Sequence, residues 1–538
     1  MLDIKSNFFR SKEFKLFLTV WIVYIFYLQM FGSSTMANSQ SALTAAIVNE
    51  GRFEIDTYYR VAGGGIAFYD DHYYSGQAPG ISFISVPIYI VSRPIFYLLP
   101  KEIINSLFEK LENYGASLPD DYDGNKRIPS SYLPGFSKRQ ILEYLIISGF
   151  ILPLFTTSLF SALTVLLLYL FLKRFTKNDK LRMVITLFFA FGTLRFSLAT
   201  GFLERPIAIF FMFAAFIILF KIRHKELKSK KATLFVAGIL AGLSAWFDYF
   251  HLFVAGLLFI YLLSFYIKGK TIRTKGFKRL WIFDLNKQKL SLLLSFFVGA
   301  SIPVFLLFSY YYIVFDNPFT QSYAYTVLPE SVAKISGIFD IKLPGMDTLV
   351  YMLNSFLYSP IIFLVFYGIY RALIKKDVYY RDALAIAIFA IFTFMYASIL
   401  TFTYPSAIAT EFNRHMTPIL PYLFIFSPYI FVNNNLLKKN KMKILFIVVG
   451  IISLFLNWTS TQYSGLHTLD QPALNDEQLV AISKFLSNGP SSDFLHTLAG
   501  VMDWNSLFLN LIGLAVLILL LFMIWKPYLK NLGTKKPS

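Results

Sequence analysis

Acidic side chains gather near the start of the chain at spacings that suit chemistry. Phe53-Glu54-Ile55-Asp56 places two carboxylates at i and i+2, and in an extended segment these project from the same side. Such a pair could supply a general base or hold a divalent ion through oxygen ligands, and it could equally belong to a solvated loop. Glu54 and Asp56 are therefore candidate catalytic residues, and the candidate ligands if a Mg²⁺ or Mn²⁺ ion binds.

A denser cluster follows at Asp70-Asp71-His72-Tyr73-Tyr74. It could ligate a metal or cap a turn, and for His72 alone a structural role is the stronger interpretation. Gln77-Ala78-Pro79-Gly80 sets the start of the next apolar segment, with proline near its first turn. Asp70 and Asp71 are further catalytic candidates, and Tyr74 is a candidate substrate-binding residue because it would face the same cavity.

Charged residues also lie at the edges of apolar runs. Glu204 and Arg205 sit between two such runs, where they could wall a site or form an interfacial salt bridge, and Arg195 has the same ambiguity. Arg414 and His415 lie at the mouth of another run, and a guanidinium there suits bidentate binding of a phosphate. Glu204, Arg205, Arg414 and His415 are therefore candidate substrate-binding residues, and Arg195 is not included among them.

The elements that position these residues are apolar. Of the 538 residues, 56% are hydrophobic and only 15% charged, whereas a soluble domain carries about 25% charged residues. This deficit predicts an all-α integral membrane protein. The chain has no cysteine, which excludes disulfides, thiolate nucleophiles and cysteine metal sites.

Twelve apolar runs approach the length of a membrane span, which needs about 20 residues. Segment 81–99 is also apolar, but Pro87, Arg93 and Pro94 favour an interfacial helix. A further surface helix is expected over 38–49, ended by Gly51. The predicted spans are 15–32, 144–172, 183–200, 205–220, 232–247, 252–267, 290–314, 352–370, 383–403, 416–432, 444–457 and 507–525.

The distribution of charge agrees with a cytoplasmic N-terminus. The seven segments then assigned to the cytoplasm hold 35 of the 50 Lys and Arg residues but only 7 of the 31 acids. Topology thus accounts for the net charge of +19, and a nucleic-acid partner is not expected. Both termini are predicted to be cytoplasmic, and the acidic stretch to be in a large first external loop, 33–140.

Several pieces of the chain resemble the GT-C superfamily of membrane glycosyltransferases that use polyprenyl-phosphate sugars. This group includes protein O-mannosyltransferases and the lipid A aminoarabinose transferase, and the similarity is to an uncharacterised prokaryotic, mannosyltransferase-like branch. The similar pieces are N-S-Q-S-A-L-T-A-A-I-V-N-E-G-R-F-E-I-D at 38–56, Y-D-D-H-Y-Y-S-G-Q-A-P-G-I-S-F at 69–83, Y-Y-I-V-F-D-N-P-F-T-Q-S-Y at 311–323, F-L-Y-S-P-I-I-F-L at 356–364 and N-R-H-M-T-P-I-L-P at 413–421.

The resemblance implies a catalytic membrane module over 1–435, followed by C-terminal transmembrane helices over 436–538 with an external loop at 458–506. It implies inverting transfer of a hexosyl or pentosyl group, with a first-loop acid as base and basic residues holding the phosphate. The acceptor would be a glycan, lipid or protein of the cell envelope. Many relatives carry an acid directly after the first span, whereas this chain reads M-A-N-S-Q there. Asp56 is consequently the first choice as base.

Two other classes of function are considered. A flippase or export component would move a lipid-linked glycan without cleaving it, and a degenerate relative would share the fold without catalysis. The sequence does not identify the sugar, the acceptor or the length of the lipid carrier.

Overall fold

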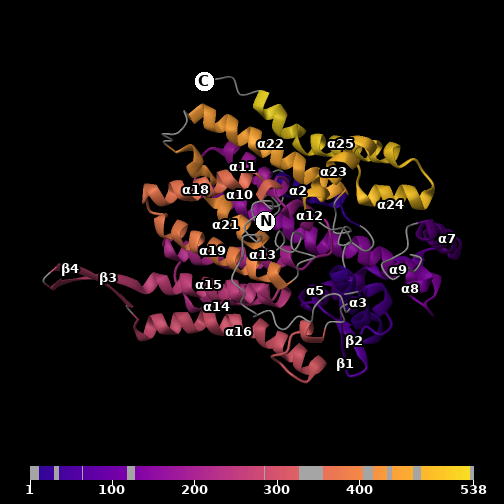
Figure 1. The fold of residues 1–538 in the computed structure, drawn as a ribbon, viewed down its shortest axis with the longest axis horizontal. Coiled ribbons are helices and arrows are strands. Elements are labelled where there is room, and N and C mark those ends of the chain that lie inside the picture. Colours follow the sequence, from indigo (N-terminus) through magenta and orange to yellow (C-terminus); the bar gives the residue numbers. More distant parts are fainter. Residues whose placement is uncertain are drawn as a thin grey trace, which may run out of the picture. The chain divides into compact units, whose positions relative to one another are not determined.

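The chain folds mainly into helices in the computed structural model (Figure 1). The structure describes residues 11–29, 35–63, 65–117, 128–274, 276–283, 285–325, 356–403, 416–432, 439–463 and 474–533. They form two compact units, one of Met1–Gln77, Ile81–Pro206 and Ser322–Ser538, the other of Ala78–Gly80 and Ile207–Gln321. We call them unit 1 and unit 2.

Unit 1 contains most of the helices and one short hairpin. Its first part has α2 (Lys12–Phe26), α3 (Thr35–Glu50), α4 (Tyr59–Ala62), β1 (Ile66–Tyr69), β2 (His72–Ser75), α5 (Gly80–Ser92), α6 (Pro94–Leu98), α7 (Lys101–Ser117), α8 (Pro129–Tyr132), α9 (Lys138–Ile146), α10 (Leu159–Phe171), α11 (Asp179–Phe191) and α12 (Arg195–Leu198). Its second part has α18 (Ile361–Lys375), α19 (Tyr380–Thr403), α21 (Leu420–Ile425), α22 (Lys439–Tyr463), α23 (Leu474–Asn488), α24 (Asp493–Met502) and α25 (Ser506–Gly533).

Unit 2 is built on three helices that pack side by side, α14 (Lys231–Phe247), α15 (Phe250–Leu263) and α16 (Lys287–Phe315), as Figure 1 shows. Most of α13 (Arg205–Arg223) belongs to the same unit. A Gly238-x-x-x-Gly242 pattern on α14 faces α16, and a Cβ added at Gly238 would lie 2.0 Å from the carbonyl oxygen of Phe296. Small residues at such spacing let two helix backbones approach closely. The antiparallel strands β3 (Ile267–Thr274) and β4 (Gly276–Phe283) lie between α15 and α16 in the chain.

The prediction of twelve spans is wrong for the part of the chain that the structure describes. Six helical stretches there are long and apolar enough to cross a membrane, namely Gly80–Leu98, Lys138–Arg174, Arg205–Arg223, Lys287–Phe315, Asn440–Gln462 and Ser506–Lys526. Other predicted spans form shorter helices, such as α2 with 15 residues and α11 with 13. In 416–432, Pro418, Pro421 and Pro428 divide the segment into short 3-10 and α-helical pieces, because proline cannot donate a backbone hydrogen bond.

Segment 81–99, predicted as an interfacial helix, forms a long helical stretch, and its placement along or across a membrane stays a prediction. Gly80–Leu98 has the length and hydropathy of a membrane span, although Arg93 divides it into α5 and α6. Arg93 had argued against a span, but its Nε lies 3.2 Å from Oε1 of Glu143 on α9, and Glu143 is 2% exposed. The arginine thus has a counter-ion that lies 50 positions away in sequence and is supplied by folding.

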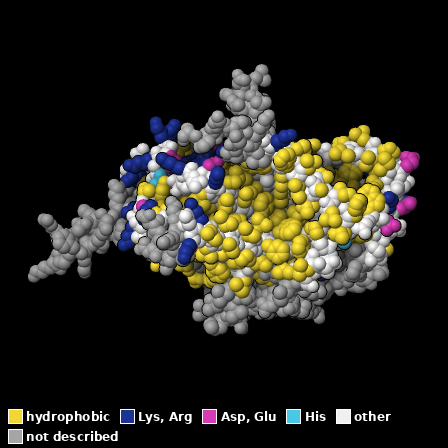
Figure 2. Space-filling model, turned by 90° about the horizontal axis from the view of Figure 1, so that it is seen from above, with side chains coloured by type: hydrophobic (Ala, Val, Ile, Leu, Met, Phe, Trp, Pro, Cys, Tyr) yellow, Lys and Arg dark blue, Asp and Glu magenta, His cyan; other side chains and the backbone are white. Residues whose placement is uncertain are grey.

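The surface of unit 1 carries a broad apolar face. On α25, Phe508, Ile518 and Phe522 are each more than half exposed, and on α22 so are Ile444 and Ile451. Many hydrophobic side chains are visible on the surface in Figure 2. An apolar helix surface of this kind is expected where lipid replaces water. The structure shows no membrane, so the sidedness of the chain stays a prediction.

Candidate functional site

A β-hairpin that sequence reasoning missed organises the acidic stretch. Strands β1 and β2 pair antiparallel, with Phe68 opposite Tyr73 and Tyr69 opposite His72. Asp70 and Asp71 form the two-residue turn, with φ of 49° and 62°. Positive φ at both central residues is the signature of a type I′ turn, which matches the twist of the strands that it joins. These two acids thus have a structural role, and their catalytic role stays a prediction.

Asp56 forms hydrogen bonds to β2, the second strand of this hairpin. Its Oδ2 lies 2.7 Å from Nδ1 of His72, and its Oδ1 accepts a 2.7 Å hydrogen bond from the backbone N–H of Tyr73. The neighbouring N–H of Ile55 donates to the carbonyl of Tyr73 at 2.7 Å. The two acidic clusters of the sequence, 53–56 and 70–74, are therefore parts of one site, which we call the hairpin site.

The hairpin site is accessible to solvent, and its acidic residues affect the pKa of His72. The side chains of His72 and Asp56 are 50% and 42% exposed. The pKa of His72 is raised above its usual value, chiefly by the hydrogen bond to Asp56. Burial opposes this effect, and the negative charges of Asp56, Glu54 and Asp70 add to it. The imidazole therefore binds a proton more readily here than in water.

Aromatic rings pack on Tyr73 and Tyr69, the residues next to and opposite His72. Tyr59 stacks on Tyr73 with ring centroids 4.6 Å apart and planes inclined by 7°, and Phe68 lies 5.0 Å from Tyr73. Tyr69 packs at 4.7 Å against Tyr325, which belongs to the 3-10 turn Ser322–Tyr325. The hairpin thus meets a segment more than 250 positions further along the chain.

A second polar cluster lies inside unit 1, around the start of α3. Gln40 Nε2 donates a 3.0 Å hydrogen bond to Oε2 of Glu204, and Ser39 Oγ lies 3.2 Å from Ser75 Oγ. Ser82 Oγ donates to the carbonyl of Gln40 at 2.8 Å. The predicted substrate-binding residues Glu204, Arg205 and Tyr74 are all nearly buried, with exposed fractions of 5%, 7% and 6%. Access of a ligand to these three side chains would require a movement of the surrounding helices.

Three further charged residues were singled out in the sequence, namely Arg195, Arg414 and His415. Arg414 and His415 lie outside the residues that the structure describes. Arg195 is 1% exposed, its Nη2 donates to the carbonyl of Ser161 at 3.2 Å, and its guanidinium lies 5.2 Å from the ring of Phe189. Arg195 is therefore enclosed by unit 1.

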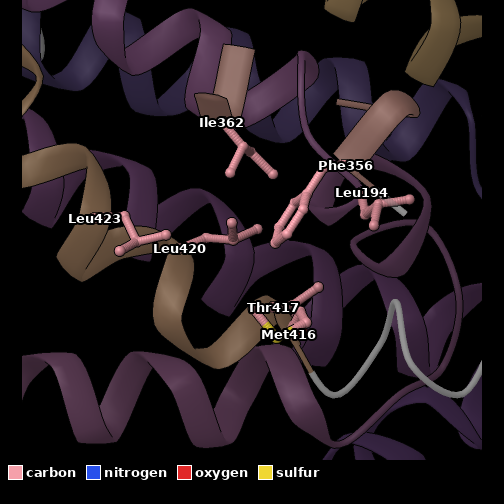
Figure 3. Close-up of a pocket in the computed structure, with 7 residues that line it drawn as sticks. All are labelled: Leu194, Phe356, Ile362, Met416, Thr417, Leu420 and Leu423. Carbon is pink, nitrogen blue, oxygen red and sulfur yellow. The ribbon is translucent and has the colours of Figure 1, made fainter. Parts of the chain in front are cut away.

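Unit 1 contains a small apolar pocket, lined in part by residues of 416–423. Figure 3 shows side chains of Phe356, Ile362 and Leu420 pointing toward one another across it. The residues that line it are Leu194, Phe356, Ile362, Met416, Thr417, Leu420 and Leu423. Such a lining suits hydrocarbon and offers few groups for polar recognition.

The described residues contain no group of three or more His, Asp or Glu side chains placed to hold a metal ion. Both oxygens of Asp56, one of the two predicted ligands, are engaged by protein groups, His72 and the backbone of Tyr73. Metal binding by Glu54 and Asp56 stays a prediction, and an ion there would share Asp56 with His72 and Tyr73.

The hairpin that carries His72 could have been found in the sequence. I-A-F-Y-D-D-H-Y-Y-S at 66–75 has two short β-prone runs separated by two aspartates, a pattern typical of a tight hairpin. A hairpin there would have placed His72 at the head of a strand, but it would not have predicted the contact with Asp56. The contact with Tyr325 has no local signal.

Comparison with known proteins adds no family to this description. A scan against protein-family models and a search of the curated proteins both find no match for this chain. The chain is a helical protein with, in its described part, six helices long and apolar enough to cross a membrane, and with a solvent-accessible Asp–His pair on a hairpin.

Proposed function

We propose that this protein is a membrane glycosyltransferase that moves a sugar from a polyprenyl-phosphate carrier to an acceptor, with inversion at the anomeric carbon. The observation that carries the proposal is the Asp56–His72 pair, an acid–base group fixed at an accessible position of a membrane-type helical protein. The GT-C-like pieces of sequence supply the class of reaction, and Asp56 lies in the first of them.

The donor would be held by its two chemically different ends. Arg414 would bind the phosphate, and the exposed apolar side chains of α22 and α25 offer a surface suited to isoprenoid hydrocarbon. Negative charge develops on the phosphate as the sugar leaves, so a nearby guanidinium stabilises the transition state more than the ground state. Arg205 is the alternative cation for this role.

The hairpin site would face the outside of a cell membrane, with both termini in the cytoplasm. The support is the concentration of Lys and Arg in the segments predicted to be cytoplasmic. Because the chain has no cysteine, single cysteines can report sidedness. In intact cells, a membrane-impermeant maleimide should label Thr57→Cys and leave Lys228→Cys unlabelled until the cells are opened. The reverse pattern would contradict the orientation.

The reaction is tested with purified protein and a panel of polyprenyl-phosphate sugars, with and without a chelator. Consumption of one carrier with release of its phosphate is expected, and Asp503→Asn, which alters an exposed acid in unit 1, should leave the rate unchanged. Transport of a lipid-linked glycan without cleavage would instead favour a flippase or export component. Neither cleavage nor transport would favour a degenerate relative of the enzymes.

A further inference from the structure

We propose that His72 accepts the proton of the acceptor hydroxyl or amide, and that Asp56 is a positioning residue that orients the imidazole. This rests on the proposed transferase function and changes the identity of its base. The sequence had favoured Asp56 as the base and a structural role for His72. The geometry points to the opposite division of work.

The carboxylate of Asp56 has both of its oxygens engaged. Oδ1 receives the N–H of Tyr73 and Oδ2 lies against Nδ1 of His72, each at 2.7 Å. Short hydrogen bonds of this kind are strong when the acceptor is charged. Taking the acceptor proton onto Asp56 itself would weaken both bonds, because protonation removes the negative charge that strengthens them.

His72 is oriented in the way that a base requires. A carboxylate on Nδ1 favours the tautomer with hydrogen on that nitrogen, which leaves the lone pair on Nε2. The His72 side chain is half exposed, so a substrate can approach it. The carboxylate of Asp56, 2.7 Å from Nδ1, would stabilise the imidazolium that forms when Nε2 takes up the proton.

Backbone hydrogen bonds hold the two side chains in register from both sides. Ile55 N–H binds the carbonyl of Tyr73, and Tyr58 N–H binds the carbonyl of Ile55 at 2.8 Å. The ring hydroxyl of Tyr58 accepts from Asn49 Nδ2 at 2.8 Å, which ties the segment to the end of α3. His72 itself begins β2 opposite Tyr69. A merely solvated surface pair would need no such support.

The proton and electron pairs balance in one displacement. The acceptor oxygen or nitrogen attacks the anomeric carbon as its hydrogen passes to Nε2 of His72. The bond from the anomeric carbon to the phosphate oxygen breaks, and the phosphate leaves with that electron pair. The imidazolium, paired with Asp56, then returns its proton to water. No oxidant, reductant or further co-reactant is consumed.

The test compares transfer rates of His72→Gln, Asp56→Asn and the double variant. His72→Gln should lower kcat about 100-fold or more, as loss of a general base does. The double variant should be no slower than His72→Gln, because Asp56 acts through His72. His496→Gln is the matched control, since His496 is also exposed and hydrogen-bonded through Nδ1, to Ser506.

A pH profile separates a positioning role from a structural one. Activity of the wild-type protein should fall as acid protonates His72. In Asp56→Asn, the acid limb should move to lower pH because the principal cause of the raised pKa is removed, while Glu54 and Asp70 still act in the same direction. Imidazole added to His72→Gly should restore part of the rate, whereas a purely structural defect would not respond.

Failure of the His72 assignment and failure of the proposed transferase function would give different results. If the wild-type protein transfers sugar and His72→Gln retains its rate within about 3-fold while Asp56→Asn is inactive, His72 is not the base and the transferase function stands. If the wild-type protein consumes no donor of the panel, the proposed function fails, and the assignment of a base fails with it.

Discussion

Gln40 and Glu204, 164 positions apart, meet through a 3.0 Å hydrogen bond in the interior of unit 1. Gln40 is fully buried and Glu204 is 5% exposed. Folding thus brings a carboxylate to the start of α3, close to M-A-N-S-Q, where the chain has no acid of its own. This relationship places the Glu204 carboxylate beside α3, although the two residues are far apart in sequence.

Gln40→Leu should destabilise the protein by about 1.5–3 kcal/mol, because the buried Glu204 would lose a hydrogen bond to a charged group. Glu204→Gln should cost less, since an amide oxygen can still accept from Gln40. Thermal unfolding in detergent measures both effects. Unfolding of Gln40→Leu at the wild-type temperature would show that this bond contributes nothing.

Local patterns in the sequence were informative where neighbouring residues decide the structure. The helix expected over 38–49 is present as α3, and Gly51 ends it with a φ of 67°, a conformation that glycine adopts without strain. Its prediction as a surface helix is wrong, because Ala42, Leu43 and Ala46 are fully buried in unit 1. Apolar runs with few charges became five of the six long helices. Pro418, Pro421 and Pro428 indicate in the sequence that 416–432 does not form a continuous helix.

Contacts between residues that are far apart in the sequence could not be predicted from local patterns. The charge of Arg93 suggested a surface helix because its partner, Glu143, lies on another element. The apposition of Asp56 and His72 depends on the turn at Asp70 and Asp71, and that of Tyr69 and Tyr325 depends on the fold of the whole unit. Composition therefore predicts the helices, whereas the candidate site arises from tertiary pairing.

Gly238→Ala should destabilise unit 2 by about 1–3 kcal/mol through overpacking. The added methyl group would meet the carbonyl oxygen of Phe296 at 2.0 Å, and backbone atoms of α16 cannot move aside as a flexible side chain can. Gly256→Ala on α15 is the control, because no atom lies within 4 Å of the added Cβ. That change should be neutral or stabilising by up to about 1 kcal/mol, since alanine favours helices.

Opposite signs for the two glycine variants are the diagnostic result, measured by thermal unfolding of purified protein. Equal stability of Gly238→Ala and the wild-type protein would mean that α14 and α16 do not approach as closely as the structure has them.

Asp179→Asn should weaken the packing of α2, α10 and α11 by about 1 kcal/mol, a modest figure because solvent screens these charges. Asp179 Oδ2 lies 2.7 Å from Lys12 Nζ, and its Oδ1 accepts from Arg182 at 2.6 Å and from the hydroxyl of Tyr169 at 2.5 Å. Burial alone would raise the pKa of Asp179, but hydrogen bonds from Lys12, Tyr169 and Arg182 hold it well below its usual value.

The sign of the pH dependence follows from that depression. Stability from Asp179 is fully present above the unfolded-state pKa of about 3.9 and is lost as pH falls toward the lower folded-state pKa. The difference between wild-type and Asp179→Asn unfolding temperatures should therefore be largest near neutrality and shrink below about pH 4. Asp503→Asn, at an exposed acid, should show no such difference at any pH.

Asp71→Gly should keep the hairpin and retain transfer activity within about 3-fold, because Asp-Gly is among the favoured sequences for a type I′ turn. Asp71→Val should weaken the turn by about 1–2 kcal/mol, since a β-branched side chain disfavours the φ of 62° found at this position. His72 follows directly, so a distorted turn would also displace the imidazole from Asp56 and lower the rate. Hydrogen exchange at the backbone N–H of Tyr73, which binds Asp56, reports the turn independently of activity. Loss of activity in Asp71→Gly with that N–H still protected would mean that the Asp71 carboxylate itself takes part in the reaction.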